Sequence, residues 1–201
     1  MPEIKDMTAV LQEIASSSTP VFLSAESTDI VFQTTIKDSE NGKLTLENNV
    51  PIDKITEFLD AKRFFIQAQL IRLETEEIQS DGVNIVFPLS SLSMKEDNRG
   101  AKRVFFDQKD DVYLEVVNPY DGETVIKRPI IDISNTGISI KSPTASKLYN
   151  PGTKFLGMKV LVNGEIYNEV SGQVIYHRKF LDLKGKYYYQ IGFQFDKPVQ
   201  N

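Results

Sequence analysis

The sequence predicts a mainly β chain of two small antiparallel β-barrels, with a short helix at the N-terminus. Short runs rich in β-branched and aromatic residues recur along the chain, and Gly, Pro, Asn and Asp separate them. The dipeptides Asn41-Gly42 and Asn163-Gly164 are typical of tight hairpin turns. A length of 201 residues accommodates one large or two small domains.

Composition limits the classes of protein to which the chain can belong. The formal net charge is −5, which disfavours binding of nucleic acid through bulk electrostatics. The chain has no cysteine and a single histidine, His177, and no cluster of carboxylates accompanies that histidine, so we expect no metal site. No leader-like start and no apolar run of membrane-spanning length is present, and we therefore expect a cytoplasmic protein without membrane insertion.

The N-terminal segment, residues 1–17, predicts a helix over residues 6–16. Met7, Val10, Leu11 and Ile14 recur at helical spacing, and Asp6 is placed to cap the first turn. The favoured role of this apolar stripe is docking on a barrel, and binding to a partner is the alternative.

Residues 18–90 predict a small β domain with helical decoration. Its expected strands cover 21–25, 30–37, 43–47, 64–73 and 83–87, whereas Ile52–Lys62 has the apolar spacing of a helical turn or two. No set of residues in this domain suggests a ligand site.

A polar stretch, Pro88–Asn98, lacks a convincing period and predicts a connector, with the linker proper at 91–98. The second domain is expected over residues 99–197. Its predicted strands are 104–106, 112–117, 124–133, 138–141, 155–162, 169–177 and 187–195, with a turn at Pro119–Gly122.

Two short patterns at the start of the second domain carry the chemistry. Arg99 and Arg103 are four residues apart, and a guanidinium matches phosphate oxygens and the O6/N7 edge of guanine. Asp132 and Ser134 place an acceptor and a hydroxyl two residues apart, and Gly137 permits a positive φ or a close backbone approach. Each pattern alone is more often a solvated face or a plain turn, but together they suit a ligand with both guanine and phosphate.

This combination resembles the PilZ domain, the bacterial receptor module for cyclic di-GMP. The family pattern is RxxxR followed, a few tens of residues later, by [D/N]xSxxG, and both halves are present here. Gly172–Tyr176 resembles the late GxV strand of the family, and Tyr189–Phe195 its closing strand. The first half of the chain is similar, more loosely, to the N-terminal domain of YcgR-type two-domain flagellar-brake proteins.

The resemblance implies a cyclic di-GMP receptor with no enzymatic activity and no cofactor. Arg99 and Arg103 would grip guanine edges and phosphates, Asp132 and Ser134 would fix the guanine, and Gly137 would let the turn approach the ligand. Asn98 precedes the first motif where family members with a basic residue tend to bind an intercalated ligand dimer, so one ligand per site is expected here.

Binding would change the interdomain arrangement and signal to a partner in motility, such as the flagellar motor or stator, or in exopolysaccharide export. Two alternatives stay open at this point. The chain could be a PilZ-fold adaptor that binds the nucleotide weakly or not at all, or a barrel that binds single-stranded nucleic acid, which the acidic net charge disfavours.

Overall fold

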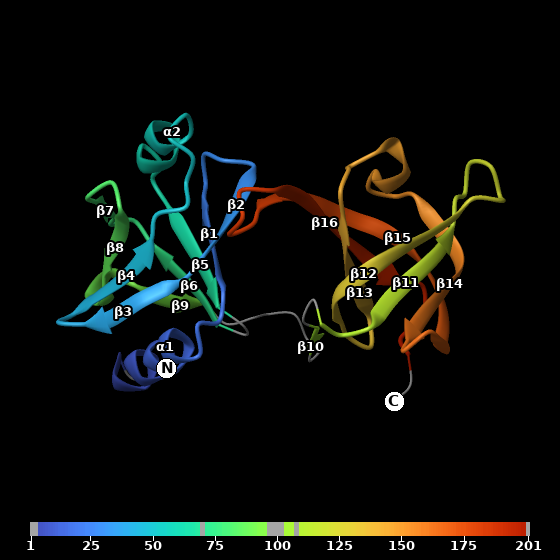
Figure 1. Cartoon of the computed structure of the whole chain (residues 1–201), viewed down its shortest axis with the longest axis horizontal. Coiled ribbons are helices and arrows are strands. Elements are labelled where there is room, and N and C mark those ends of the chain that lie inside the picture. The colour runs from blue at the N-terminus through green and yellow to red at the C-terminus, as the bar shows by residue number, and fades with distance from the viewer. Residues whose placement is uncertain (1–3, 69–70, 96–102, 107–108, 200–201) are drawn as a thin grey trace. The chain divides into compact units, whose positions relative to one another are not determined.

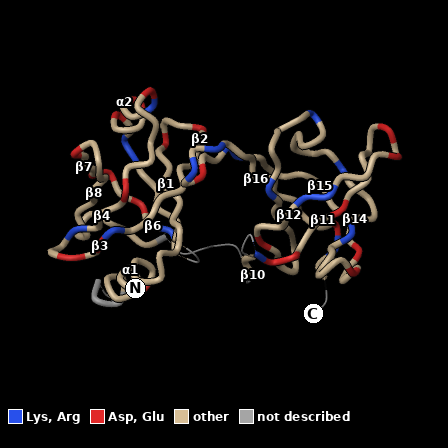
Figure 2. The backbone as a smooth tube through the Cα atoms, viewed as in Figure 1, with Lys and Arg blue, Asp and Glu red and all other residues tan. Residues whose placement is uncertain are grey.

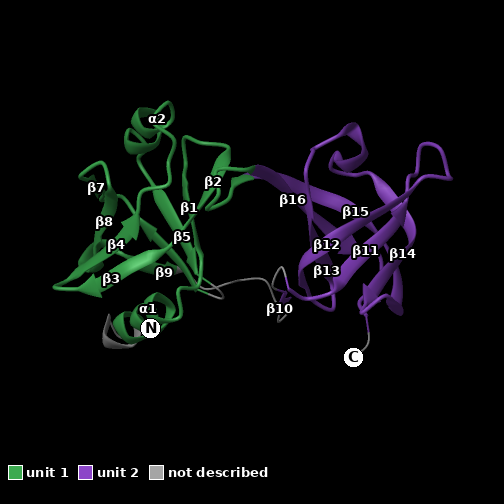
Figure 3. Ribbon diagram, in the orientation of Figure 1, with its two compact units in different colours: residues 1–98, 180–186 green, residues 99–179, 187–201 purple. Residues whose placement is uncertain are grey.

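The computed structural model describes residues 4–68, 71–95, 103–106 and 109–199. The chain divides into two compact units, which are coloured separately in Figure 3. Unit 1 comprises Met1–Asn98 and Phe180–Lys186, and unit 2 comprises Arg99–Lys179 and Tyr187–Asn201.

Unit 1 combines two antiparallel sheets with two helices, labelled in Figure 1. The elements, in chain order, are α1 (Ile4–Ser16), β1 (Val21–Ala25), β2 (Ile30–Thr34), β3 (Ile36–Glu40), β4 (Lys43–Glu47), α2 (Ile55–Leu59), β5 (Phe64–Ala68), β6 (Ile71–Thr75), β7 (Gln79–Ser80), β8 (Asn84–Pro88), the 3₁₀ turn η1 (Leu89–Ser91) and β9 (Ser93–Lys95). One sheet has the order β2-β1-β5-β6-β9 and the other β3-β4-β8-β7.

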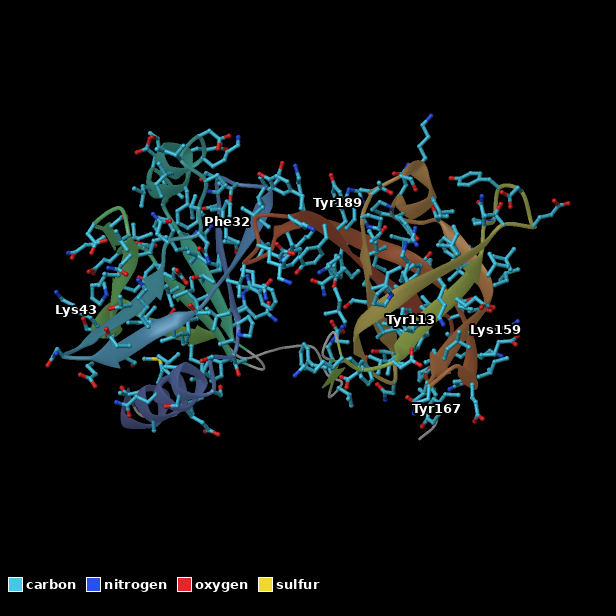
Figure 4. The ribbon with its side chains drawn as sticks, viewed as in Figure 1. Phe32, Lys43, Tyr113, Lys159, Tyr167 and Tyr189 are labelled. Carbon is cyan, nitrogen blue, oxygen red and sulfur yellow. The ribbon has the colours of Figure 1, made fainter. Side chains whose placement is uncertain are left out.

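The core of unit 1 is formed by side chains at alternate positions of its strands and by the apolar stripe of α1. Val21, Leu23 and Ala25 are buried at every second position of β1, and Phe32 (labelled in Figure 4) packs edge-on against Phe58 of α2. The stripe of α1 lies in the same core through Met7, Leu11 and Ile14, as its spacing predicts. The described part of the helix begins earlier than expected, at Ile4, which places Asp6 within its first turn and not at the predicted N-cap position.

The predicted connector is partly wrong. Residues 89–95 form η1 and β9, and β9 pairs with β6 through Arg72↔Lys95, Leu73↔Met94 and Glu74↔Ser93. An edge strand of three residues is too short to show the two-residue period on which the expectation rested. Its pairing with β6 makes this segment part of unit 1.

Unit 2 is a closed six-stranded antiparallel barrel. Its strands are β11 (Val112–Val117), β12 (Val125–Ile133), β13 (Gly137–Ser142), β14 (Lys154–Val162), β15 (Glu165–Leu181) and β16 (Tyr187–Phe195), with the 3₁₀ turn η2 at Lys147–Tyr149. They follow the order β14-β11-β12-β13-β16-β15, and pairing of β14 with β15 closes the barrel. The short strand β10 (Val104–Phe105) pairs with the end of β12.

The barrel encloses a second core of apolar side chains from every strand, which includes Leu114, Ile130, Ile140, Phe155, Val174, Ile191 and Phe193. Phe155 and Phe193 pack edge to face, with ring centroids 5.4 Å apart. The prediction of a mainly β chain with a short N-terminal helix is confirmed, as is the antiparallel barrel of the second domain. The strands of unit 1, which were expected to form another barrel, belong to two sheets.

The segment Phe180–Lys186 belongs to unit 1, although the strands on either side of it belong to unit 2. Strand β15 runs well past the predicted end at His177, and its last residues lie next to β2 in the sheet of unit 1. Leu181 is 6% exposed within the core of unit 1, and the ring of Phe180 meets that of Phe22 edge to face at 5.5 Å. Unit 1 therefore completes its core with residues from the second half of the chain.

Replacement of Leu181 by alanine should destabilise unit 1 by about 2–5 kcal/mol, because the change leaves a cavity in its core. Hydrogen exchange of β1 and β2 amides measures this effect, and exchange there should become faster. Leu183→Ala is the matched control: Leu183 is two residues away but 44% exposed, so its loss should change stability by less than about 0.5 kcal/mol. Loss of protection confined to the barrel strands would contradict the assignment of Leu181 to unit 1.

The turn between β11 and β12 is held by one carboxylate. Asp121 accepts hydrogen bonds from the backbone N–H groups of Glu123 and Thr124, both at 2.9 Å, and from the Thr124 hydroxyl and the Asn118 amide, both at 2.7 Å. These bonds, those of the two backbone groups first, lower the pKa of Asp121 from 3.8 to about 2.

Because this pKa is lowered, the stability that Asp121 contributes is present above pH 4 and is lost as the pH falls toward 2. We therefore expect the melting temperatures of the native chain and of Asp121→Ala to differ above pH 4 and to converge as the pH approaches 2. Thermal unfolding followed by circular dichroism tests this, and a difference that stayed constant across that range would contradict it.

Candidate functional site

The second motif lies at the hairpin between β12 and β13, and a β-bulge sets the direction of its carboxylate. Ile130 pairs with the core residue Ile140, whereas Asp132 pairs with Ser139, and the register shifts between the two pairs. Ser139 lies between Ile138 and Ile140, which face the core, so alternation turns Ser139 to the outer face of the barrel. The bulge moves Asp132 to that same outer face.

Four side chains from four segments meet on this outer face, and we call them the Asp132 network: Arg103, Asp132, Ser139 and Gln190. Arg103 forms an ion pair with Oδ1 of Asp132. The Ser139 hydroxyl donates to Asp132 Oδ2 at 2.5 Å, and the Gln190 amide nitrogen donates to the same oxygen at 3.3 Å. That nitrogen also donates to Ser139 Oγ at 2.9 Å.

The network is largely removed from water. Asp132 is 3% exposed and Ser139 is fully buried, while the Arg103 side chain is 16% exposed. A charged pair in such a place is stable only when hydrogen bonds satisfy the remaining polar atoms, and Ser139 and Gln190 supply them to Asp132. The Nε of Arg103 is buried and has no hydrogen-bond partner among the described residues. The guanidinium thus has one donor that no described residue uses.

Pairing of β10 with β12 explains how the two motifs meet although Arg103 and Asp132 are 29 positions apart in the sequence. Phe105 pairs with Asp132 and Val104 with Ile133, which brings Arg103 to the end of this ladder beside the carboxylate. The structure therefore brings together Arg103 and Asp132, one residue from each motif. Asn98 and Arg99, the other predicted residues of the first motif, lie outside the described residues.

Ser134 does not join the Asp132 network; its hydroxyl closes the hairpin turn. Ser134 N donates to the carbonyl of Gly137 at 2.8 Å, and Ser134 Oγ accepts from the N–H of Thr136 at 3.3 Å. The carbonyl of Thr136 in turn accepts from Phe195 N at 2.9 Å, which ties the turn to β16. The turn is thus held in place by β16, and Ser134 is buried within it.

Gly137 is required by close packing and not by a positive φ. A Cβ at this position would lie 2.4 Å from the carbonyl oxygen of Phe193, a backbone atom of the neighbouring strand. Of the two reasons that the sequence leaves open for this glycine, close backbone approach is the one that the structure provides, and the approach is to β16.

Ser139 and Gln190 are not among the site residues predicted from the sequence. Each is a polar residue within an apolar strand, Ser139 between two isoleucines and Gln190 between Tyr189 and Ile191. Such a residue marks the outer face of a barrel strand, and this is the signal that could have located them. Its weakness is that outer faces are commonly polar, so alternation alone does not link these residues to Asp132.

The histidine and the three consecutive tyrosines lie outside the Asp132 network and have other contacts. His177 Nδ1 lies 3.3 Å from the carbonyl oxygen of Tyr149, and Tyr189, labelled in Figure 4, packs against the barrel core. The ammonium of Lys141 lies 4.2 Å from the ring centroid of Tyr188, and that of Lys179 lies 4.1 Å from that of Tyr187. The three tyrosines therefore alternate between faces, as expected of a strand.

The two units differ in net charge. Unit 2 contains 13 basic and 10 acidic residues, a net charge of +3, whereas unit 1 contains 10 basic and 18 acidic residues, a net charge of −8. Figure 2 shows Lys and Arg in blue and Asp and Glu in red along each unit. An anionic ligand is therefore favoured on the barrel in spite of the acidic chain as a whole.

Unit 1 contains a surface hollow between α1, the β3–β4 hairpin and η1, and its lining differs in charge from the barrel site. Its lining residues are Thr8, Gln12, Ser39, Glu40, Asn41, Gly42, Leu89 and Ser90. Glu40 is the charged residue of this lining, and no lysine or arginine accompanies it. The hollow therefore does not suit a phosphate-bearing ligand.

Within the described part of the chain, no group of three or more histidine, cysteine or carboxylate residues could hold a metal ion. No described helix combines the length and the apolar character needed to cross a membrane.

Comparison with known proteins identifies the family. The sequence model of the PilZ domain matches residues 97–201, more than half of the chain. This chain belongs to the PilZ domain family. No curated protein matches its sequence significantly.

Solved structures share the fold over nearly the whole chain. The complex of MrkH from K. pneumonia with c-di-GMP has a TM-score of 0.65 at 17% identity, covering 96% of this chain and 86% of that one. YcgR from Escherichia coli, in complex with c-di-GMP, has a TM-score of 0.57 at 15% identity, covering 96% and 82%. At these identities the likeness concerns the fold, and it extends over both units of this PilZ protein.

Proposed function

We propose that this PilZ protein is a receptor for cyclic di-GMP and that it performs no catalysis. The observation that carries the proposal is the ion pair of Arg103 and Asp132, which joins one residue from each motif on the outer face of a positively charged barrel. The Arg103 Nε has no partner among the described residues, and a planar guanidinium fork matches the O6/N7 edge of guanine and the oxygens of phosphate. The solved complexes of MrkH and YcgR with c-di-GMP, which share the fold, support the choice of ligand.

Each motif residue has a role in this proposal. Arg103 and Arg99 grip the guanine edges and phosphates, and Asp132 holds Arg103 in place. Ser134 and Gly137 keep the hairpin turn beside the site, because Ser134 closes the turn through bonds to Thr136 and Gly137, and Gly137 packs against β16. The neutral Asn98 before the first motif favours one ligand per site.

Ligand binding would change the arrangement of the two units. The chain passes from unit 1 to unit 2 between Asn98 and Arg99, so arginines that clamp a ligand on the barrel would also fix this passage. The output would be signalling in the cytoplasm to a protein partner of motility, such as the flagellar motor or stator, or of exopolysaccharide export.

Isothermal titration calorimetry with cyclic di-GMP tests the proposal. We expect saturable binding with a Kd in the micromolar range or below and about one ligand per chain. Affinity should fall as the salt concentration rises, because the ligand is a dianion and the site is cationic. Absence of heat and of any competition with labelled nucleotide would overturn the receptor function and would favour a PilZ-fold adaptor without nucleotide binding.

A further inference from the structure

The carboxylate of the second motif is largely occupied before any ligand arrives. A carboxylate offers about four lone-pair sites. Arg103 takes one on Oδ1, and Ser139 and Gln190 take two on Oδ2. With 3% of Asp132 exposed, this group is placed to position the arginine and has little capacity left to accept from a base.

Gln190, unlike Asp132, is only half-buried, and among the described residues its side-chain hydrogen bonds all come from its amide nitrogen. A carboxylate can only accept, so the group that faces Asp132 Oδ2 must be the amide nitrogen and not the carbonyl oxygen. This fixes the direction of the Gln190 carbonyl, Oε1, away from Asp132. Among the described residues, no hydrogen-bond partner of Oε1 is found.

A protein that recognises guanine needs a hydrogen-bond acceptor such as the Gln190 carbonyl oxygen. The O6/N7 edge of guanine accepts, but the adjoining edge carries the N1–H and 2-amino donors, and a site that recognises guanine must offer an oxygen to them. The guanidinium of Arg103, which only donates, suits the O6/N7 edge. Gln190 donates to one oxygen of Asp132 and Arg103 pairs with the other, so both side chains lie beside the same carboxylate.

We propose that Gln190 is a specificity-determining residue of this site, and that its side-chain carbonyl oxygen accepts from the 2-amino edge of a guanine held by Arg103. The inference rests on the proposed function. In this arrangement Asp132 and Ser139 are positioning residues, and Gln190 makes the contact that separates guanine from bases without a donor at that edge.

The test pairs one substitution with one change of ligand. Cyclic di-IMP carries hypoxanthine, which is guanine without the 2-amino group. For the native chain we expect calorimetry to give an affinity about tenfold higher for cyclic di-GMP than for cyclic di-IMP. Gln190→Met keeps the length of the side chain and removes the acceptor, so this ratio should fall to about one or two.

Ser139→Ala is the matched control, since it weakens the support of Asp132 and leaves the Gln190 oxygen in place. Both affinities should fall together and the ratio should persist. A native chain that binds neither nucleotide overturns the receptor function itself. Native binding of cyclic di-GMP with no preference over cyclic di-IMP, or a preference that survives in Gln190→Met, overturns only the role of Gln190.

A second measurement needs no variant. The ¹³C signal of the Gln190 side-chain carbonyl should shift on addition of cyclic di-GMP and should shift far less with cyclic di-IMP. Equal shifts with the two nucleotides would overturn the proposal even if Gln190→Met failed to fold.

Discussion

Arg103→Ala should lower the affinity for cyclic di-GMP by about 30-fold or more, which corresponds to about 2 kcal/mol. The substitution removes a charged, planar donor from the site. It also leaves Asp132 as a buried carboxylate without its cation, next to a ligand that is itself anionic. Both effects oppose binding, and calorimetric titration of the folded variant measures their sum.

The same substitution should cost the barrel about 3 kcal/mol of stability, because it breaks an ion pair whose two side chains are 16% and 4% exposed. Arg63→Ala is the matched control. Arg63 pairs with Glu26 on the surface of unit 1, where both side chains are almost half exposed, and its loss should leave cyclic di-GMP binding unchanged.

Arg103→Lys separates the two roles of the guanidinium. Lysine keeps the charge opposite Asp132 but lacks the planar fork, so we expect most of the stability to return while the affinity stays low. Native affinity in Arg103→Lys would show that the fork makes no bidentate contact with the ligand. Native affinity in Arg103→Ala would remove Arg103 from the binding site.

The strands were predictable where alternation and turn residues agree. β1, β4 and β11 have the bounds that their sequence patterns predict, because each alternates between core and surface. β16 also has its predicted bounds, although its burial does not alternate. β9 was missed because three residues on a sheet edge carry no period. The extension of β15 to Leu181 was missed because those residues are buried in unit 1, and the sequence of β15 does not reveal that partner.

The site was predictable in its charges but not in its hydrogen bonds. The spacing of the two motifs pointed to Arg103 and Asp132, and the structure joins them. The expectation that Asp132 and Ser134 share a face depended on a regular strand end, and the two side chains have different partners. The roles of Ser139 and Gln190 depend on the bulge between Ile130 and Asp132, and a bulge of one residue leaves no clear mark in the sequence.

Gly137→Ala should destabilise the barrel by about 3 kcal/mol, the upper end of the usual cost of overpacking. Its new Cβ would lie 2.4 Å from the carbonyl oxygen of Phe193, and that atom belongs to a strand paired along its length with β13. Neither backbone can yield without breaking the ladder. We expect the melting temperature of the ligand-free barrel to fall by more than about 10 °C, as measured by calorimetry.

The melting temperature of Gly137→Ala also shows whether Gly137 serves packing on β16 or approach of the ligand. Asn135→Ala is the matched control, since this exposed side chain lies in the same turn and its loss leaves the bond from Val199 N to the Asn135 carbonyl intact. That variant should keep the native melting temperature. If Gly137→Ala melted like the native chain but failed to bind cyclic di-GMP, the glycine would serve approach of the ligand and not the contact with β16. A lower melting temperature without ligand identifies the packing of the hairpin on β16 as its role, with any loss of affinity a consequence of that packing.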